Sequence, residues 1–256
     1  MDMNLVYMKN IYKSFGEVQA LKGVDFEVGT NEVVGLIGDN GAGKSTLIKI
    51  LSGVFPFTKG EMNIKGQKIN PKEYSVRKAH EMGIETVYQE QALGLKQSLW
   101  RNIFLGRQPT NSLGFIQMNQ VRNETNKIMR EFLGFTGGGV SPESRVSTLS
   151  GGERQGVAIG RAMYFEADLV ILDEPTRALS VKEINKVLRF ISQVKDRGKA
   201  CIYISHTISN IYSVSDRFVL LDRGKLVGAY NRDSISEYEL ADEVIHHSTS
   251  AEFENR

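Results

Sequence analysis

The segment Gly38–Ser45, with the sequence GDNGAGKS, constrains the fold of this chain more than any other feature. It follows an apolar run, Val33–Ile37, and precedes a stretch up to Ser52 in which leucine and isoleucine recur at helical spacing. Its glycines let the main chain turn tightly, so that successive N–H groups and the start of a helix point toward one anion. The sequence therefore predicts a strand, a phosphate-binding turn and a helix, which is the context that the pattern G-x-x-x-x-G-K-[ST] requires.

The residue types in this turn match the chemistry of a nucleotide phosphate site. Lys44 is expected to contact the β and γ phosphates, and the Ser45 hydroxyl is expected to ligate Mg²⁺. The alternative, a surface turn that binds nothing, is disfavoured by the strand and the helix on either side. The residues expected to bind the nucleotide here are Gly38, Asp39, Asn40, Gly41, Ala42, Gly43, Lys44, Ser45 and Thr46.

Two adjacent carboxylates, Asp173 and Glu174, end a second apolar run, Leu169–Leu172. Open α/β folds bind their ligands at the carboxyl ends of such strands. Asp173 is expected to hold the Mg²⁺ shell, and Glu174 to orient or deprotonate an attacking water. The alternative is a charged turn before Pro175, which is disfavoured by the presence of a phosphate-binding motif in the same chain.

The composition is that of a globular protein. The 256 residues are 41% hydrophobic and 24% charged, and the formal net charge of +2 is too small to attract nucleic acid or anionic lipid in bulk. No apolar stretch reaches the length of a membrane span, and Met1–Asn10 lacks the pattern of a secretory signal. The single cysteine, Cys201, excludes an internal disulfide and is expected to be a small buried apolar residue in a reducing compartment.

The distribution of apolar runs predicts a two-sided, mostly parallel sheet, because short apolar strands alternate with amphipathic helices. The polar region 93–150 is expected to be a helical insertion with a helix at 119–133, and a second amphipathic helix is expected at 181–197. The last 24 residues carry seven acidic side chains and one basic one and are expected to be a solvated tail. The strands are expected at 5–8, 23–28, 33–37, 61–64, 169–172, 201–204 and 218–221.

A third motif, Leu149–Gln155 with the sequence LSGGERQ, resembles the LSGGQ signature of ABC-type ATPases. It offers a hydroxyl and exposed amides at a helix start but no lysine and no Mg²⁺ ligand, so it suits completing a phosphate site rather than forming one. In that family the signature of one subunit covers the γ-phosphate held by the other. The resemblance implies a head-to-tail dimer around two ATP, with contacts from Ser150, Gly151, Gly152 and Glu153.

Three further positions resemble elements of the same family. Phe15 resembles the aromatic residue that stacks on adenine, although a core phenylalanine is the simpler alternative. Gln89 resembles the glutamine that touches Mg²⁺ and water and hinges the helical subdomain. His206, two residues after the apolar run Cys201–Ile204, resembles the histidine that hydrogen-bonds the γ-phosphate. His80, His246 and His247 match no element and are expected at the surface.

The resemblance implies a fold and its divisions. The fold is an α/β P-loop NTPase with a RecA-like core, a mostly parallel sheet, an N-terminal antiparallel β-subdomain and an inserted α-helical subdomain. The core with its β-subdomain is expected at 1–92, the helical subdomain at 93–165, the rest of the core at 166–232 and the acidic tail at 233–256. The catalytic residues would be Glu174, His206, Gln89 and Lys44, and the metal ligands Ser45, Gln89 and Asp173.

Within the family, the chain looks most like the ATP-binding subunits of bacterial monosaccharide importers. The likeness implies ATP and Mg²⁺ as cofactors. It implies as partners a second copy of the chain, separate permease subunits and, indirectly, a sugar-binding protein, but no nucleic acid. It also implies that the chain acts at the cytoplasmic face of the membrane. Three residues depart from the family pattern. Glu153 replaces the signature glutamine, Ser180 replaces an aspartate that contacts the opposed site, and Arg177 precedes it unexpectedly.

Other functions remain open at the level of sequence. A soluble ABC ATPase of translation or DNA repair is disfavoured by the single cassette and by the absence of room for a long coiled coil. A non-hydrolysing, nucleotide-gated binding subunit is suggested by the altered residues around Ser180. A small-molecule P-loop kinase is the weakest alternative, because it has no use for the signature.

Overall fold

The computed structural model describes residues 4–88, 93–131, 139–176 and 179–253. The chain forms two compact units, of which the first comprises 1–86 and 168–256 and the second comprises 87–167. The sequence places the helical subdomain at 93–165, and the second unit is longer than this at both ends. None of the helices in the described residues is both long and apolar enough to cross a membrane.

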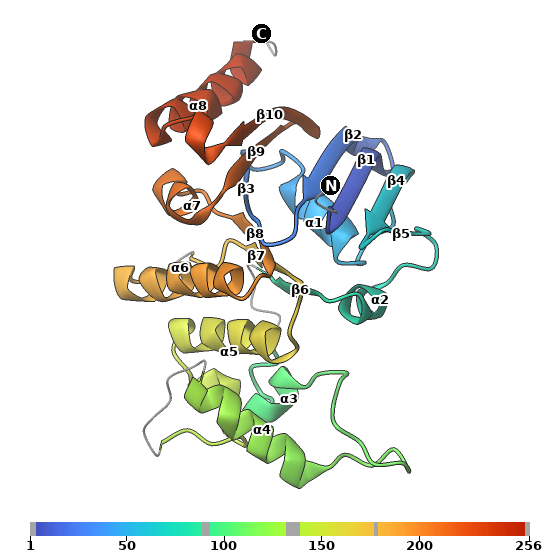
Figure 1. The fold of residues 1–256 in the computed structure, drawn as a ribbon, viewed down its shortest axis with the longest axis vertical. Coiled ribbons are helices and arrows are strands. Elements are labelled where there is room, and N and C mark those ends of the chain that lie inside the picture. The colour runs from blue at the N-terminus through green and yellow to red at the C-terminus, as the bar shows by residue number, and fades with distance from the viewer. Residues whose placement is uncertain (1–3, 89–92, 132–138, 177–178, 254–256) are drawn as a thin grey trace. The chain divides into compact units, whose positions relative to one another are not determined.

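The first unit contains two sheets (Figure 1). One is antiparallel, in the order β2 (Val18–Val28), β1 (Val6–Phe15), β4 (Lys59–Ile64) and β5 (Gln67–Lys68). The other has the order β10 (Lys225–Asn231), β9 (Arg217–Asp222), β3 (Val33–Ile37), β8 (Ala200–Ile204), β7 (Leu169–Asp173) and β6 (Ile84–Val87). In this second sheet β9, β3, β8 and β7 run parallel, whereas β10 pairs antiparallel with β9.

The helices follow the expected alternation with strands. In the first unit they are α1 (Lys44–Leu51), α2 (Val76–Glu81), α6 (Val181–Asp196), α7 (Ile208–Val214), the 3-10 turn η2 (Arg232–Ser234) and α8 (Glu237–Phe253). In the second unit they are α3 (Leu99–Ile103), α4 (Met118–Glu131), the 3-10 turn η1 (Val146–Thr148) and α5 (Gly151–Tyr164). The helix expected at 119–133 corresponds to α4, which begins one residue earlier, and its expected end lies outside the described residues. The helix expected at 181–197 corresponds to α6, which ends one residue earlier.

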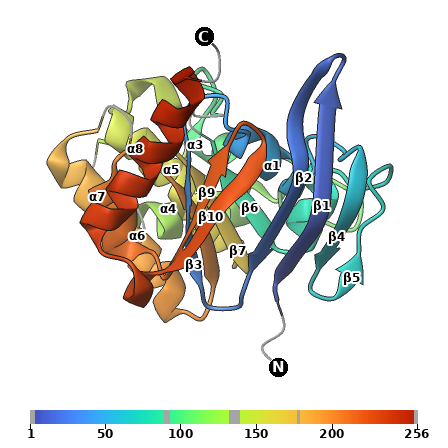
Figure 2. The same ribbon diagram turned by 90° about the horizontal axis from the view of Figure 1, so that it is seen from above.

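The central strands are covered on both faces. Every residue of β3, β7 and β8 is buried. Leu36 and Ile202 pack in one core with α1 and the antiparallel sheet, while α6 and α7 lie on the opposite face (Figure 2). A strand buried on both sides has no polar face, which explains why these strands appear in the sequence as continuous apolar runs. Cys201 of β8 is fully buried, as expected, and burial raises the pKa of its thiol.

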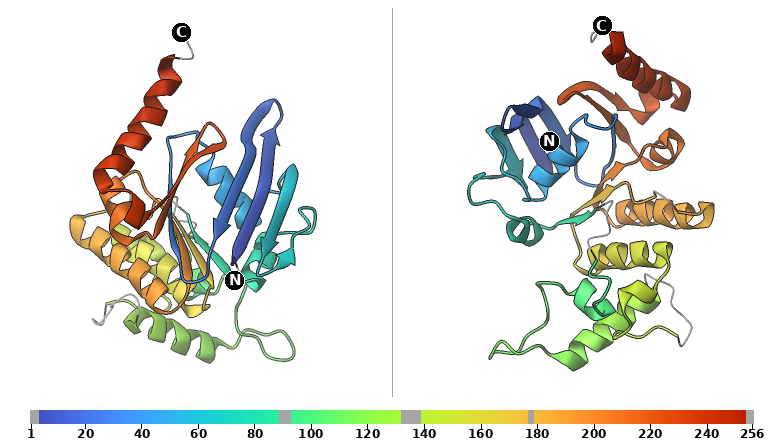
Figure 3. Two further views of the ribbon diagram at one scale, coloured as in Figure 1. Left: turned by 45° about the horizontal axis from the view of Figure 1, so that its top comes forward. Right: turned by 180° about the vertical axis from the view of Figure 1, so that it is seen from behind.

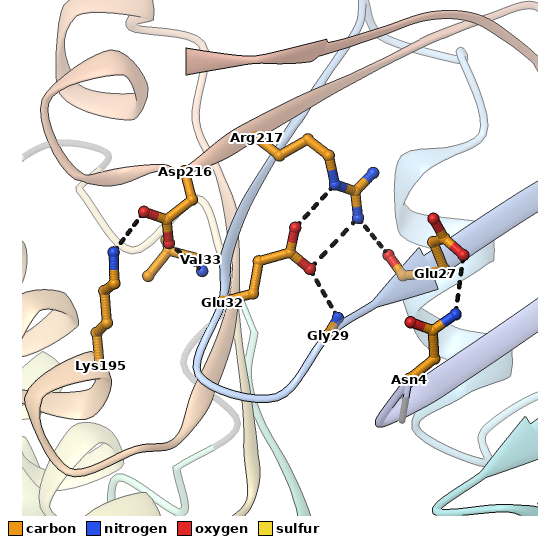
Figure 4. A network of polar contacts seen from close by, with 8 residues as sticks. All are labelled: Asn4, Glu27, Gly29, Glu32, Val33, Lys195, Asp216 and Arg217. Carbon is orange, nitrogen blue, oxygen red and sulfur yellow. Dashed lines mark hydrogen bonds and ion pairs between the residues drawn. The ribbon is translucent and has the colours of Figure 1, made fainter. Parts of the chain in front are cut away.

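A polar network fixes the edge of the sheet where β3 and β9 begin (Figure 4). Arg217 donates to Glu32 at 2.8 Å and to the carbonyl oxygen of Glu27 at 2.8 Å. Asp216 accepts a hydrogen bond from the backbone of Val33 at 2.9 Å and pairs with Lys195 of α6. These contacts join three separate parts of the chain at the end of the sheet opposite to the glycine-rich turn, so they are structural.

The second unit has its own apolar core. It is built from helices α3, α4 and α5 and includes Leu99, Ile103 and Val157, all fully buried. The α4 helix contributes Val121 and Ile128, two turns apart on one face. This core explains how a region poor in strands forms a compact unit.

The C-terminal segment differs from the expectation of a solvated tail. It forms η2 and α8, and α8 packs against α7 and β9 (Figure 3). Leu240 is fully buried, Ile235 is 8% exposed, and the Tyr212 hydroxyl donates to the Ile235 carbonyl oxygen at 3.2 Å. The expectation is therefore wrong for this part of the segment, because two apolar anchors outweigh its acidic composition.

Candidate nucleotide site

The glycine-rich turn links β3 to α1 and has the conformation that its glycines permit. Gly38, Gly41 and Gly43 have φ angles of 148°, 85° and 106°, which side chains rarely adopt. A Cβ atom on Gly38 would lie 2.2 Å from the Leu221 carbonyl oxygen, and one on Gly43 would lie 2.8 Å from Leu21 Cδ2. The turn is therefore packed against the chain behind it, and its open side can accept a phosphate group.

The support behind the turn is a feature that the sequence analysis missed. The turn between β9 and β10 places Gly224 against the phosphate-binding loop, where its N–H donates to the Ala42 carbonyl oxygen at 2.9 Å. Its own carbonyl oxygen accepts from the Lys22 N–H at 2.7 Å. Gly224 has φ 81°, and an added Cβ would lie 2.7 Å from the Ala20 carbonyl oxygen. The only sequence signal was a glycine following Asp222 and Arg223, which is typical of any tight turn.

Gly224→Ala is expected to lower ATP affinity as well as stability, because the added methyl group displaces the support of the phosphate-binding loop. The strained backbone alone costs on the order of 1 kcal/mol. Gly66→Ala is the matched control, since Gly66 has φ 75° with open space around its Cβ position and lies away from this loop. Thermal unfolding and calorimetric ATP titration measure both effects. Equal ATP affinity in the two variants would contradict the supporting role.

Lys44 is held over the loop by the loop's own carbonyl groups. It is 7% exposed, and its ammonium donates to the carbonyl oxygens of Gly38 at 2.5 Å and Asp39 at 3.0 Å. Burial lowers its pKa, and the carboxylates of Glu174, Asp173 and Asp39 oppose that change. The Lys44 ammonium therefore has neutral carbonyl partners in the loop, and a bound phosphate would give it a stronger, anionic partner.

Asp173 ends β7 as a buried carboxylate. Its residue is 6% exposed, and its pKa rises to about 6, first because of burial and second because of the neighbouring Glu174. Lys44, Lys49 and His206 oppose this rise. A buried carboxylate with an elevated pKa beside an anion-binding loop gains from a bound cation.

Glu174 and His206 lie side by side, as their positions after neighbouring strands β7 and β8 require. His206 Nε2 is 2.7 Å from Glu174 Oε1, and the side chains are 48% and 10% exposed. The Glu174 N–H donates to the Ile204 carbonyl oxygen at 3.0 Å, and its backbone has φ 49°. A non-glycine residue in the left-handed region is uncommon, and such conformations concentrate at functional sites.

The residues present fit a Mg²⁺ ion shared with phosphates. The hydroxyl of Ser45, which is exposed in the first turn of α1, and the carboxylate of Asp173 are hard oxygen ligands. Within the described part of the chain, no three histidine, cysteine or acidic side chains gather into a metal site. This donor set suits Mg²⁺, which proteins commonly hold through one or two carboxylates and the substrate's phosphates.

The signature segment begins α5 in the second unit. Ser150 is the N-cap: its hydroxyl accepts from the Glu153 N–H at 3.2 Å, and its own N–H donates to Glu153 Oε2 at 2.8 Å. A carboxylate performs this capping as well as an amide. Glu153 therefore keeps the helix start intact despite its departure from LSGGQ. Gly151 and Gly152 form the first turn of the helix.

The remaining expected residues have different outcomes. Phe15 ends β1 and is 43% exposed, which excludes the alternative of a core phenylalanine. Ser180 is the N-cap of α6 in a reciprocal pair with Glu183, so it supplies the capping group that an aspartate would also supply. Gln89 and Arg177 lie outside the described residues. Their expected roles stay predictions.

Of the three histidines expected at the surface, His246 is exposed, whereas His80 and His247 are half-buried. His80 has a 28% exposed side chain, and its Nε2 lies 3.9 Å from the carboxylate of Glu85, which is 2% exposed. His80 and His247, with side chains 28% and 29% exposed, are therefore half-buried rather than fully at the surface. His246 is exposed, and His247 lies 3.8 Å from Glu243 on the same helix.

A mostly parallel sheet with a phosphate-binding loop after β3 and paired acids after β7 defines an ATPase of the P-loop class. Residues 21–177 match the family model described as ABC transporter. The chain belongs to the ABC transporter family, as the signature motif indicates.

Sequence relatives support the narrower resemblance. The chain is 41% identical, over 88% of its length and 87% of the relative, to a xylose/arabinose import ATP-binding protein of Sulfolobus acidocaldarius. It is 37% identical to a xylose import ATP-binding protein of Moorella thermoacetica and to a ribose import ATP-binding protein of Escherichia coli O157:H7. It covers 46% and 45% of those two proteins, so it spans less than half of their length.

Solved structures support the fold. A nucleotide-free ATP-binding cassette from an ABC transporter matches with a TM-score of 0.78 at 24% identity, covering 95% of this chain and 98% of the other. A dimeric cassette bound to ADP and Pi in a post-hydrolysis state matches with a TM-score of 0.76 at 23% identity, covering 90% of this chain and all of the other. The expected α/β fold is therefore confirmed.

Proposed function

We propose that this chain is the ATP-binding and ATP-hydrolysing subunit of an ABC importer for a monosaccharide. The observation that carries the proposal is the joining of Lys44, Asp173, Glu174 and His206 into one electrostatically coupled site beside the phosphate-binding loop. The relatives' names, which refer to import of xylose, arabinose and ribose, support a sugar as the cargo.

The residues of the site divide the work of phosphoryl transfer. The loop amides and Lys44 bind the phosphates and stabilise the charge that develops on the γ-phosphoryl group. Glu174 accepts a hydrogen bond from the attacking water, aligns it with the phosphorus atom and takes up its proton as the new P–O bond forms. His206, 2.7 Å from Glu174, fixes that carboxylate and can donate to a γ-phosphate oxygen. Gln89 is proposed to contact the same water.

Ser45 and Asp173 are the residues that would hold Mg²⁺, with Gln89 as a further ligand. When bound, Mg²⁺ supplies charge neutralisation to the phosphate oxygens. Phe15 is proposed to stack on the adenine, since an exposed aromatic ring next to the site suits a planar base. The phosphates of the nucleotide are proposed to bind to the loop and the first turn of α1, from Gly38 to Thr46.

The signature belongs to a composite site in this proposal. Ser150 caps the start of α5, and Gly151 and Gly152 form its first turn; a helix N-terminus of this kind suits an anion but carries no cation of its own. Two copies arranged head to tail would place the signature of each against the ATP of the other. ATP binding then closes the dimer, and hydrolysis lets it open.

The mechanical work passes to other polypeptides. Closure of the dimer would drive a conformational change in separate permease subunits, and a sugar-binding protein would deliver the sugar to them. The chain would act at the cytoplasmic face of the membrane as a peripheral subunit. Its sugar would never contact this polypeptide.

Mixing two inactive variants tests the composite site. Lys44→Ala removes the phosphate-binding ammonium, and Ser150→Arg blocks the signature. In an equimolar mixture half of the dimers contain both chains, and each of these has one intact site, so phosphate release is expected to recover to about a quarter of the wild-type rate. Each variant alone is the control. Absence of recovery, with mixed dimers shown by differential tagging, would contradict the head-to-tail arrangement.

A further inference from the structure

Three side chains gather at the end of the β1–β2 hairpin. The ring of Phe15 lies with its centroid 5.2 Å from that of Phe55, at an interplanar angle of 74°. The ammonium of Lys13 lies 4.9 Å from the centroid of Phe15 and 5.6 Å from that of Phe55. The same ammonium donates to the Pro56 carbonyl oxygen at 2.8 Å, which ties β1 to the segment after α1.

The two rings have different environments. Phe55 is half-buried and packs against the hydrophobic core, whereas Phe15 is 43% exposed. An edge-to-face contact to an anchored ring and a cation over the ring both restrict the orientation of Phe15. An exposed aromatic ring that is already held in place loses little side-chain freedom when a planar ligand stacks on it.

The cluster adjoins the phosphate-binding loop. The strand that follows the hairpin brings Leu21 and Ala20 against Gly43, where an added Cβ would lie 2.8 Å from the leucine and 3.0 Å from the alanine carbonyl oxygen. Lys49 of α1, one turn after Ser45, has its ammonium 5.8 Å from the centroid of Phe55. The rings therefore lie beside the helix and the loop that bind the phosphates.

We infer that Phe55 and Lys13 are positioning residues, which hold the Phe15 ring for stacking against the base of the bound nucleotide. The inference rests on the proposed function, which supplies the nucleotide and the stacking role of Phe15. It adds a division of labour: Phe15 contacts the base, Phe55 fixes its ring through an edge, and Lys13 joins both rings to the Pro56 carbonyl group.

Calorimetric titration with two ligands tests the inference. Mg-ATP carries the base, whereas Mg-tripolyphosphate engages only the phosphate site. Phe15→Ala is expected to weaken Mg-ATP binding about tenfold. Phe55→Leu keeps apolar bulk but removes the ring, and is expected to weaken it about threefold to tenfold. Both variants are expected to bind tripolyphosphate within about twofold of the wild type.

Two comparisons separate positioning from a general structural role. Phe55→Tyr retains the ring edge and is expected to restore wild-type ATP affinity. In the double variant, Phe55→Leu is expected to add no further loss to Phe15→Ala, because Phe55 acts through Phe15. Phe115→Leu, at an exposed phenylalanine of the second unit, is the matched control and is expected to change neither affinity.

Each contrary outcome has a distinct meaning. Equal loss of ATP and tripolyphosphate binding in Phe55→Leu, or additive losses in the double variant, would overturn the positioning role. Wild-type protein that binds tripolyphosphate as tightly as ATP would overturn base stacking while leaving the phosphate site intact. Wild-type protein that binds neither ligand would overturn the proposed function itself.

Discussion

Glu174→Gln is expected to lower steady-state ATP turnover by at least about a hundredfold while Mg-ATP binding is retained. The substitution keeps the shape of the side chain, so the contact to His206 and the strained backbone at φ 49° are preserved. The amide cannot accept a proton from the attacking water, and the product-forming step is lost. The dimer is expected to accumulate in its ATP-bound, closed form.

Phosphate release and size-exclusion chromatography with light scattering measure the two effects of this substitution. Glu61→Gln is a suitable control, because Glu61 is an exposed residue of the antiparallel sheet away from the site. Turnover within a few fold of the wild type would contradict the role of Glu174 as the group that accepts the proton of the attacking water. Loss of ATP binding would instead show that its carboxylate supports the phosphate-binding loop through Lys44.

Strands buried on both faces were the most predictable part of the fold. β3, β7 and β8 agree with the expected runs because every residue in them is apolar or ends the strand at the site. β1 was expected only at 5–8 but extends to Phe15. In its outer half Ile11 is buried, the next three residues are half-buried and Phe15 is exposed, so pairing with β2 stabilises it rather than a continuous apolar pattern.

Local composition misled where a few contacts decide the outcome. The acidic stretch after residue 233 favours exposure to solvent. Burial of Leu240 and Ile235 is nevertheless enough to hold α8 and the segment before it against the rest of the unit. The paired acids and the glycine-rich turn were predictable because their chemistry depends on adjacent residues. The support from Gly224 was not, since 180 positions of chain separate it from Lys44 and only the parallel sheet brings them together.

The aspartates at the two ends of β7 have pKa values shifted in opposite directions. Asp173, at the carboxyl end, has a pKa raised to about 6 by burial and by Glu174. Asp168, just before the strand, is also affected by burial, but hydrogen bonds from Lys199 and Lys65 outweigh it and lower its pKa. Asp168 therefore stabilises the fold in its charged form, whereas charged Asp173 destabilises the metal-free fold.

Asp173→Asn is expected to stabilise the metal-free protein and to abolish Mg-dependent hydrolysis. The folded pKa of about 6 exceeds the ordinary 3.8, so the wild type loses stability as pH rises from about 4 to 6. The asparagine variant avoids this loss, which amounts to at most about 3 kcal/mol above pH 7. Thermal unfolding in EDTA at pH 4 and pH 8 measures it, and the difference from the wild type is expected only at pH 8.

Asp168→Asn is the matched control and is expected to destabilise the protein at pH 8, because its lysine partners lose their anion. Mg-ATP should raise the unfolding temperature of the wild type and of Asp168→Asn but raise it far less in Asp173→Asn, since ligand binding stabilises only a fold that holds the ligand. A fall in metal-free stability at pH 8 for Asp173→Asn would mean that its carboxylate is compensated by Lys44 even without a cation. In that case the site would be preorganised by charge pairing rather than completed by the metal.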